Sequence, residues 1–369
     1  MKKTRWRLIG CAALAVMIAA VTGCSGTGSE NVTVINPPIR EAAGKVELER
    51  IDRQEDSYGL AWLSDSEIIT THQPKWMEGE LTVHSLVKEK EPDRPLGVRN
   101  ALTVNPSPDL TRLFISNQME AGIVNLADGT TTKLDIHEGM TSSLNGNVRG
   151  AWVRDQAYVL ATGDELVLAE SGSGQLTLLV QLKEAQTIVK IDTASRTADP
   201  GRFTVYYLDQ DHALYALDAA PFQHHGSEGV QAPKLIRGKV EDFSVSPDGS
   251  RLAVAEETGD NKNTVLLIPA DGKGETTILA EGRLARQISW SPDGSKLAYS
   301  LFNLERGGSG LYVMDAKTGH TTLVSLYPNL QSLLLWSPDG RRLMMSQENP
   351  EMNLTTVNTK LMTEIYRFK

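Results

Sequence analysis

Cysteine is nearly absent from this chain of 369 residues, which has only Cys11 and Cys24. Both lie within the first 24 positions, so the rest of the chain has no thiol. Such a chain forms no internal disulfide, and it offers neither a thiol nucleophile nor a cysteine-based metal site. The stability of a folded domain must therefore come from packing and hydrogen bonding.

Aromatic residues are also few, at 6% of the chain, although 40% of all residues are hydrophobic. Leucine, valine and isoleucine must therefore form most of any core. No window beyond the N-terminal segment shows a sustained helical period. The Gly-x-Ser-x-Gly motif that carries the nucleophile of an α/β-hydrolase is missing as well. These absences favour an all-β domain and argue against that hydrolase class.

A Ser-Pro-Asp-Gly motif is present three times, at residues 246–249, 291–294 and 337–340. Each copy lies between two apolar runs, so we expect a type I turn between strands, with Pro at the second position. The final glycine accepts the positive φ that closes such a hairpin. The alternative is a ligand-binding aspartate in each copy, but no other polar groups converge there. We therefore interpret the following as structural turn residues: Asp248, Gly249, Asp293, Gly294, Asp339 and Gly340.

Weaker copies of the same pattern extend towards the N-terminus. The aligned aspartates are Asp65, Asp109, Asp155, Asp199, Asp248, Asp293 and Asp339, which are separated by 44 to 49 residues. Each unit contains four short strand-like runs, and four strands in about 40–45 residues are typical of a propeller blade. The sequence predicts an all-β propeller with seven four-stranded blades. Six blades are the alternative if the fourth unit, with its long segment at 219–233, is not a full blade.

A propeller must join its first and last blades, because an open sheet edge favours aggregation. The alternating run Lys45–Ile51 precedes the first unit and could supply an outer strand to the last blade. The C-terminal run Glu364–Phe368 competes for that place. The sequence alone leaves open which strand is outermost.

The N-terminus has the features of a bacterial targeting segment. Residues 1–23 combine a basic start with an apolar run of 14 residues, Leu8–Val21, which is short for a membrane span. The tetrapeptide Val21-Thr-Gly-Cys24 resembles the lipobox of bacterial lipoproteins, which implies cleavage before Cys24 and lipidation of its thiol. The alternative is an ordinary secretory signal. We expect a signal peptide at 1–23, a flexible tether at 24–44 and a propeller at 45–369.

The charge of the chain bears on its partners. Of 37 basic and 46 acidic residues, the first 23 positions hold four basic ones and no acidic one, so residues 24–369 carry a net charge of −13. This excess argues against nucleic acid as a partner and against electrostatic attachment to anionic lipid. A lipid anchor on Cys24 would therefore hold the protein at the extracytoplasmic face of the plasma membrane.

The segment Trp290-Ser-Pro-Asp-Gly-Ser-Lys-Leu-Ala-Tyr299 resembles the repeat of TolB-type (WD40-like) bacterial propellers. The resemblance is specific in three units, degenerate in four, and extends over about 300 residues. The lipobox followed by a single propeller most resembles uncharacterised, YqgU-like lipoproteins. Unlike TolB itself, this sequence has no room for an N-terminal α/β domain, which argues against a role in a Tol–Pal machine.

Propeller sites usually lie at the mouth of the channel, where the innermost strands begin. Positions six to eight residues before each aligned aspartate give the candidate binding rim Arg149, Glu241, Asp242, Arg286, Gln287 and Gln331, and Trp76 is added from a loop of the first unit. The acidic members come from one unit, whereas a calcium site needs oxygen ligands from several. The adjacent pair at 224–225 is the only histidine cluster and is a weak zinc candidate without a third ligand. We therefore expect no metal and no cofactor, and a solvated rim of mixed charge is the simplest alternative.

Three functions remain open on this basis. The first is a non-enzymatic, membrane-tethered propeller that binds a protein or peptide, or acts as an assembly scaffold, at the cell envelope. The second is an envelope hydrolase, a hypothesis that fails if fewer than three ionisable side chains from different blades meet in the channel. The third is a small-molecule sensor with a deep, closed pocket. In each case the site is expected on the face opposite the Ser-Pro-Asp-Gly turns.

Overall fold

Twenty-eight strands and no helix make up the described part of the chain. The computed structural model describes residues 45–369 apart from 74–78, 88–90, 118–119, 137–147, 164, 183–185, 196–201, 221–231, 304–307, 327–328, 331 and 353–356, and only the backbone at 349–352 and 357–358. All of these strands lie in one compact unit, Gly44–Lys369. No helix in the described part could cross a membrane. The predicted signal peptide, the tether and Cys24 lie outside the described residues.

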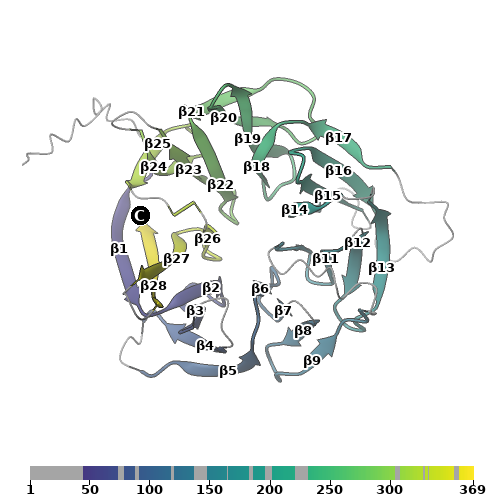
Figure 1. Cartoon of the computed structure of the whole chain (residues 1–369), viewed down its shortest axis with the longest axis vertical. Coiled ribbons are helices and arrows are strands. Elements are labelled where there is room, and N and C mark those ends of the chain that lie inside the picture. Colours follow the sequence, from purple (N-terminus) through teal and green to yellow (C-terminus); the bar gives the residue numbers. More distant parts are fainter. Residues whose placement is uncertain are drawn as a thin grey trace, which may run out of the picture. The chain divides into compact units, whose positions relative to one another are not determined.

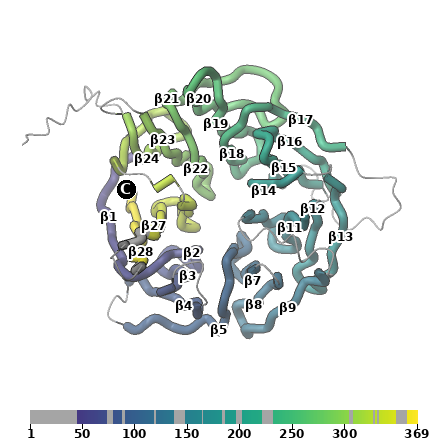
Figure 2. The backbone as a smooth tube through the Cα atoms, viewed as in Figure 1, coloured from purple at the N-terminus to yellow at the C-terminus, as the bar shows by residue number. Residues whose placement is uncertain are grey.

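The strands form seven antiparallel four-stranded sheets, arranged as blades around a central axis (Figure 1). We number the blades 1 to 7 in chain order. In each of blades 1 to 6 the chain passes from the innermost strand outwards and then crosses to the inside of the next blade, as the tube in Figure 2 shows. The prediction of a seven-bladed propeller is confirmed. The six-bladed alternative is wrong, because the fourth unit forms a complete sheet.

The strand bounds follow, from the inside outwards. Blade 1 contains β2 (Tyr58–Trp62), β3 (Glu67–Thr71), β4 (Glu80–Ser85) and β5 (Arg94–Arg99). Blade 2 contains β6 (Thr103–Pro106), β7 (Arg112–Ser116), β8 (Ala121–Asn125) and β9 (Thr131–Lys133). Blade 3 contains β10 (Ala151–Val153), β11 (Ala157–Thr162), β12 (Glu165–Glu170) and β13 (Leu176–Gln181). Blade 4 contains β14 (Ile188–Ser195), β15 (Phe203–Asp209), β16 (Leu214–Ala219) and β17 (Lys234–Arg237). Blade 5 contains β18 (Val240–Val245), β19 (Arg251–Gly259), β20 (Lys262–Pro269) and β21 (Thr277–Gly282). Blade 6 contains β22 (Leu284–Trp290), β23 (Lys296–Phe302), β24 (Gly310–Asp315) and β25 (Thr321–Ser325). Blade 7 contains β26 (Leu335–Trp336), β27 (Arg342–Met352), β28 (Val357–Phe368) and β1 (Leu48–Glu55).

Blade 7 closes the ring with strands from both ends of the propeller. Its order is β26, β27, β28 and β1, so the N-terminal strand is outermost and the C-terminal strand lies inside it. Pairing of β1 with β28 runs from Leu48 opposite Phe368 to Glu55 opposite Met362. Figure 1 shows β1 on the outer rim beside the C-terminus. Of the two competing runs, the N-terminal one therefore takes the outermost place.

The Ser-Pro-Asp-Gly segments form turns between the first and second strands of blades 5, 6 and 7. In each turn the glycine N–H donates to the serine carbonyl oxygen three residues earlier, as Gly249 does to Ser246 at 2.7 Å. The three glycines have φ between 65° and 69°, the left-handed region that favours glycine. The aspartate accepts the serine hydroxyl in the same turn, at 2.6 Å from Ser246 Oγ to Asp248 Oδ1. Local hydrogen bonds and the positive φ therefore account for the serine, the aspartate and the glycine of the motif.

The hydrophobic core is divided among the interfaces between blades. Seven clusters of buried apolar side chains are found among the described residues, one for each pair of neighbouring blades. Two tryptophans that end innermost strands, Trp62 and Trp336, also join the blades, since their indole N–H groups donate to the backbone of the preceding blade. Trp62 donates to the carbonyl of Leu335 at 2.8 Å, and Trp336 donates to that of Ser289 at 3.1 Å. The repeat is thus stabilised mainly between units, which explains why one unit cannot fold alone.

Candidate functional site

A cavity of about 610 Å³ follows the innermost strands and is lined by blades 2 to 7. Its charged side chains are Arg149, Lys190, Asp192, Glu241, Asp242 and Arg286. The cavity also extends along the strands to Pro108, in the turn of blade 2. It is therefore a channel along the propeller axis, and it is not confined to the mouth opposite the turns.

Irregular strand pairing directs several of these residues to the channel. In blade 4, Ile188 and Lys190 pair with adjacent residues of β15, which leaves Val189 unpaired between them. Glu241 is left unpaired in the same way in blade 5. In blade 6 the register shift between Arg286 and Ser289 leaves two residues of β22 unpaired, and one of them, Gln287, has a φ of +60°. A bulge places an extra residue on one strand and re-aims its side chain. Val189, Glu241 and Gln287 all line the channel.

Asp242 joins three structural elements through one carboxylate. Its Oδ2 accepts the backbone N–H of Ile288 in blade 6, and its Oδ1 accepts that of Phe243, both at 2.8 Å. The ammonium group of Lys190 in blade 4 lies 2.6 Å from the same Oδ1. This carboxylate is 8% exposed as a residue and is already occupied by donors. Asp242 therefore links blades 4, 5 and 6.

Asp192 links blades 4 and 5 in a similar way. Its Oδ2 accepts the backbone N–H of Val245 in blade 5 at 2.9 Å, and its Oδ1 accepts that of Thr193 at 2.8 Å. Burial raises the pKa of this carboxyl, and the N–H of Val245 and the charge of Lys190 act in the opposite direction. Since both oxygens face backbone donors, Asp192 presents little acceptor capacity to a ligand.

Glu241 and Arg286 form an ion pair between blades 5 and 6. Arg286 Nη2 lies 3.0 Å from Glu241 Oε2, and His212 Nδ1 lies 3.5 Å from the other carboxylate oxygen. The glutamate side chain is 17% exposed, whereas those of Arg286 and His212 are about half exposed. Glu241 is therefore contacted on one side by a cation and on the other by an imidazole ring.

Arg149 is the remaining cation of the channel, and its surroundings differ. Its Nη2 donates to the amide oxygen of Asn105 in blade 2 at 2.7 Å. Within the described part of the chain no acidic side chain pairs with it. Desolvation lowers the pKa of the guanidinium, and the Tyr158 hydroxyl acts in the opposite direction. Among the described residues, the half-buried positive charge of Arg149 thus has no carboxylate partner, unlike Lys190 and Arg286.

Exposed aliphatic side chains lie in the same channel as these charges. Val189 is 46% exposed and Leu333 is 48% exposed, and both line the cavity. The aromatic member of the lining, Trp152, is only 7% exposed, and its indole N–H is bonded to the carbonyl of Asn105 at 3.0 Å. The channel therefore presents aliphatic and charged groups to a ligand.

Of the seven residues predicted as a binding rim, five line this one channel: Arg149, Glu241, Asp242, Arg286 and Gln287. The amide of Gln287 is occupied, since it donates to the carbonyls of Asn329 and Ser332 and accepts the hydroxyl of Ser300. Trp76 and Gln331 lie outside the described residues, as do Asp199 and the histidine pair at 224–225.

The sequence analysis missed Asn105, Lys190 and Asp192, which also line the channel. The signal for Asp192 was present, because it lies seven positions before Asp199, the offset used for the other units. Lys190 lies just outside that offset, and the bulge at Val189 brings it into the channel.

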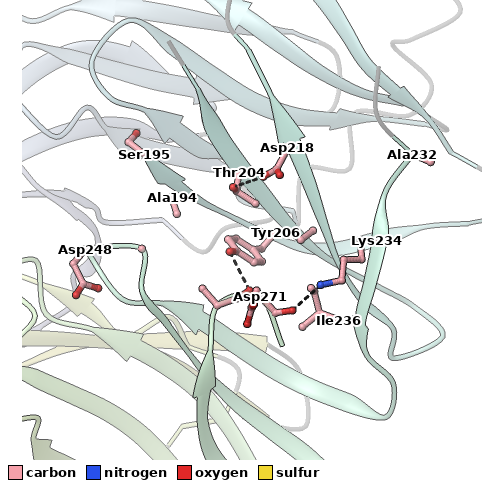
Figure 3. Close-up of a pocket in the computed structure, with 13 residues that line it drawn as sticks. Ala194, Ser195, Thr204, Tyr206, Asp218, Ala232, Lys234, Ile236, Asp248 and Asp271 are labelled. Carbon is pink, nitrogen blue, oxygen red and sulfur yellow. Dashed lines mark hydrogen bonds between the residues drawn. The ribbon is translucent and has the colours of Figure 1, made fainter. Parts of the chain in front are cut away.

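A second cavity of about 280 Å³ lies between blades 4 and 5, beside the Asp248 turn (Figure 3). The Tyr206 hydroxyl donates to the carbonyl of Ala270, and the Lys234 ammonium donates to that of Asp271, at 3.2 and 2.7 Å. Figure 3 shows these two bonds crossing the space between the blades. They connect blades 4 and 5, which is a structural role.

The ionisable groups of the channel bear on the enzyme hypothesis. Six such side chains from blades 3 to 6 line the cavity. The enzyme hypothesis required at least three from different blades, so this count does not overturn it. No group of three His, Cys, Asp or Glu side chains within the described ranges is placed to hold a metal ion. The carboxylates of the channel serve as acceptors for strands and ion pairs.

Comparisons with known proteins support the TolB-type resemblance over part of the chain. No family model matches. A stretch of 77 residues is 36% identical to the Tol-Pal system protein TolB of Alcanivorax borkumensis and covers 21% of this chain and 18% of that protein. A stretch of 86 residues is 33% identical to TolB of Xylella fastidiosa and covers 22% of this chain and 19% of that protein. The resemblance to TolB-type propellers is confirmed, although the match spans less than a fifth of these relatives, and the narrower YqgU-like resemblance is not confirmed.

Among solved structures, an oligogalacturonate lyase in complex with manganese has a TM-score of 0.57 at 12% identity, covering 89% of this chain and 99% of the lyase chain. At this identity the likeness shows the fold alone. Propellers support many unrelated activities, so function must be argued from the site.

Proposed function

We propose that this protein is a non-enzymatic propeller that binds a protein or peptide partner in its channel, while a lipid on Cys24 holds it at the cell envelope. The observation that carries the binding role is the composition of the channel. The side chains of Val189 and Leu333 are about half exposed and line the same cavity as Arg149, a cation with no acidic partner among the described residues. A concave surface that combines exposed apolar side chains with polar groups in fixed positions is typical of a binding site.

The comparison with TolB supports a protein partner rather than a small substrate. The matched relatives are named as members of the Tol-Pal system. The match spans less than a fifth of them, so their partners are not transferred to this chain. What the likeness supports is the class of function, namely a propeller that takes part in an envelope assembly.

The arrangement of the channel carboxylates argues against the alternative of an envelope hydrolase. Both oxygens of Asp192 and of Asp242 accept backbone N–H groups, and Glu241 faces Arg286 and His212. General acid–base catalysis requires a carboxyl that reaches the substrate's proton. None of these three carboxyls has an oxygen free of such partners.

Chemical crosslinking in intact cells, followed by capture of the full-length protein from membranes, tests the binding role. We expect one protein to be recovered repeatedly and in constant proportion. Recovery of no partner under several growth conditions would contradict the proposal.

The proposed anchor is tested separately, because lipidation and binding can fail independently. We expect Cys24→Ser to move the protein from the membrane fraction to the soluble fraction and to remove incorporation of labelled fatty acid. A variant that stays in the membrane would show that Cys24 is not the anchor, and it would leave the binding role standing.

A further inference from the structure

The three acidic side chains of the channel are already satisfied by partners within the protein. Asp192 and Asp242 each accept the backbone N–H of the next residue and one backbone N–H of the following blade, all at 2.8–2.9 Å. Glu241 is paired with Arg286, and Asp242 is also paired with Lys190. A ligand that carries a positive charge would therefore compete with these donors and would break contacts between blades.

Arg149, in contrast, has no acidic partner among the described residues. It is half-buried at the start of blade 3, and its single hydrogen bond within the described part of the chain is to the neutral amide of Asn105. Burying a charge without a partner is costly, so such a group favours an anion supplied from outside. The planar guanidinium has five N–H donors, and it binds a carboxylate through two of them.

Exposed aliphatic side chains are the second feature of the channel that a ligand would contact. Val189 from blade 4 and Leu333 from blade 7 line the same cavity as Arg149 and remain about half exposed. A sugar ligand is usually held by an exposed aromatic ring, but the ring in this lining, Trp152, is buried. These surroundings suit an aliphatic side chain of a peptide better than a uronic acid.

We infer that Arg149 anchors a carboxylate of an acidic peptide segment whose neighbouring aliphatic side chain contacts Val189 and Leu333. This inference rests on the proposed function, because it names the chemistry of the partner that enters the channel. Lys190 and Arg286 keep their internal partners and leave Arg149 as the site that selects for negative charge.

A selection from a random dodecapeptide library displayed on phage tests the inference on the full-length protein. Peptides recovered by the wild type are expected to be enriched in Asp or Glu next to Leu, Ile or Val. Replacement of the acid by its amide in a recovered peptide should weaken binding about tenfold or more, since a charged hydrogen bond is lost. This measurement needs no change in the protein.

Variants then assign the effect to one residue. Arg149→Gln keeps an N–H donor for Asn105 and removes the charge, and Arg149→Met removes both. The matched control is Arg286→Gln, which removes a paired cation of the same channel. We expect the preference for acidic peptides to be lost in both Arg149 variants and kept in the control, with all thermal unfolding transitions recorded alongside.

The failures of the two proposals are distinguishable. Recovery of no peptide by the wild type would contradict the proposed binding role itself. Recovery of peptides without acidic enrichment, or with enrichment that survives at Arg149→Gln, would overturn the assignment of Arg149 alone. Arg149-dependent binding of oligogalacturonate in place of peptides would show that the anchored carboxylate belongs to a sugar.

Discussion

The Asp242 carboxylate accepts the backbone N–H of Ile288 at 2.8 Å, so an acidic side chain of blade 5 holds the innermost strand of blade 6. The same arrangement recurs one blade earlier, where Asp192 accepts the N–H of Val245 at 2.9 Å. Backbone N–H groups at this depth need an acceptor. Acidic residues in the channel are thus explained by the way neighbouring blades are joined.

Asp242→Ala should lower the free energy of unfolding by about 2–4 kcal/mol, because it leaves buried N–H groups without an acceptor and the Lys190 ammonium without its carboxylate partner. Urea unfolding measures the change. The matched control is Asp260→Ala, since Asp260 is exposed and should change stability by no more than about 0.5 kcal/mol. Equal effects of the two substitutions would show that Asp242 does not stabilise the contacts between blades.

Gly294 and Gly340 have similar φ values, but they differ in the space available to an added Cβ atom. Gly294→Ala should cost about 1–2 kcal/mol through its φ of +69° alone, because its nearest neighbour would be 3.7 Å from the new Cβ. Gly340→Ala has a similar φ of +65°, but its Cβ would lie 2.8 Å from Asp293 Oδ1. We expect the second variant to be less stable than the first in the same urea titration. The reverse order would contradict the close packing of neighbouring turns.

The turn aspartates should make the protein sensitive to acid. Hydrogen bonds from the Ser246 hydroxyl and from Ser250 lower the pKa of Asp248 in the folded state. A lowered folded pKa gives stability that is present above the unfolded pKa of about 3.9 and is lost as the pH falls through the folded pKa. Asp248→Asn should therefore reduce the loss of stability between pH 4 and pH 2, measured by thermal unfolding. An unchanged acid dependence would rule out this contribution.

Ring closure by β1 predicts a different defect. A chain without residues 1–55 lacks β1 and exposes the outer edge of β28, so it should unfold at a lower temperature and self-associate. Analytical ultracentrifugation and thermal unfolding measure both effects. The matched control lacks only residues 1–44 and keeps β1. If both truncated chains behaved alike, β1 would not be needed for closure.

Much of the fold could be predicted from the sequence because its repeat is local. Seven aspartates recur at a nearly constant spacing in the sequence, and in blades 5 to 7 Ser-Pro-Asp-Gly fixes the turn after the innermost strand through its own hydrogen bonds. The choice between β1 and the C-terminal strand for the outermost place could not be made, because neither run carries a local signal for the strand with which it pairs. It depends on pairing between residues about 310 positions apart, as between Arg53 and Glu364.

The site was less predictable for a physical reason. The distance in sequence from the turn aspartate correctly predicted that Arg149, Glu241 and Asp242 line the channel. It carries no information on bulges or on hydrogen bonds between blades. The structure shows that Asp242 and Gln287 serve neighbouring strands, whereas Arg149 does not pair with any described acidic side chain. Whether a channel residue is free or occupied is decided by contacts across blades, which no local motif encodes.

Site-specific photo-crosslinking tests the central claim, that the channel is where a partner binds, most directly. A benzoylphenylalanine at Leu333 places the reactive group in the channel, and one at Ile278, which is 62% exposed on the outer strand β21, serves as the control. After irradiation of cells, we predict a covalent adduct with one protein from position 333 and none from position 278. An adduct from position 278 alone, or from neither position, would contradict the claim that the channel is the binding site.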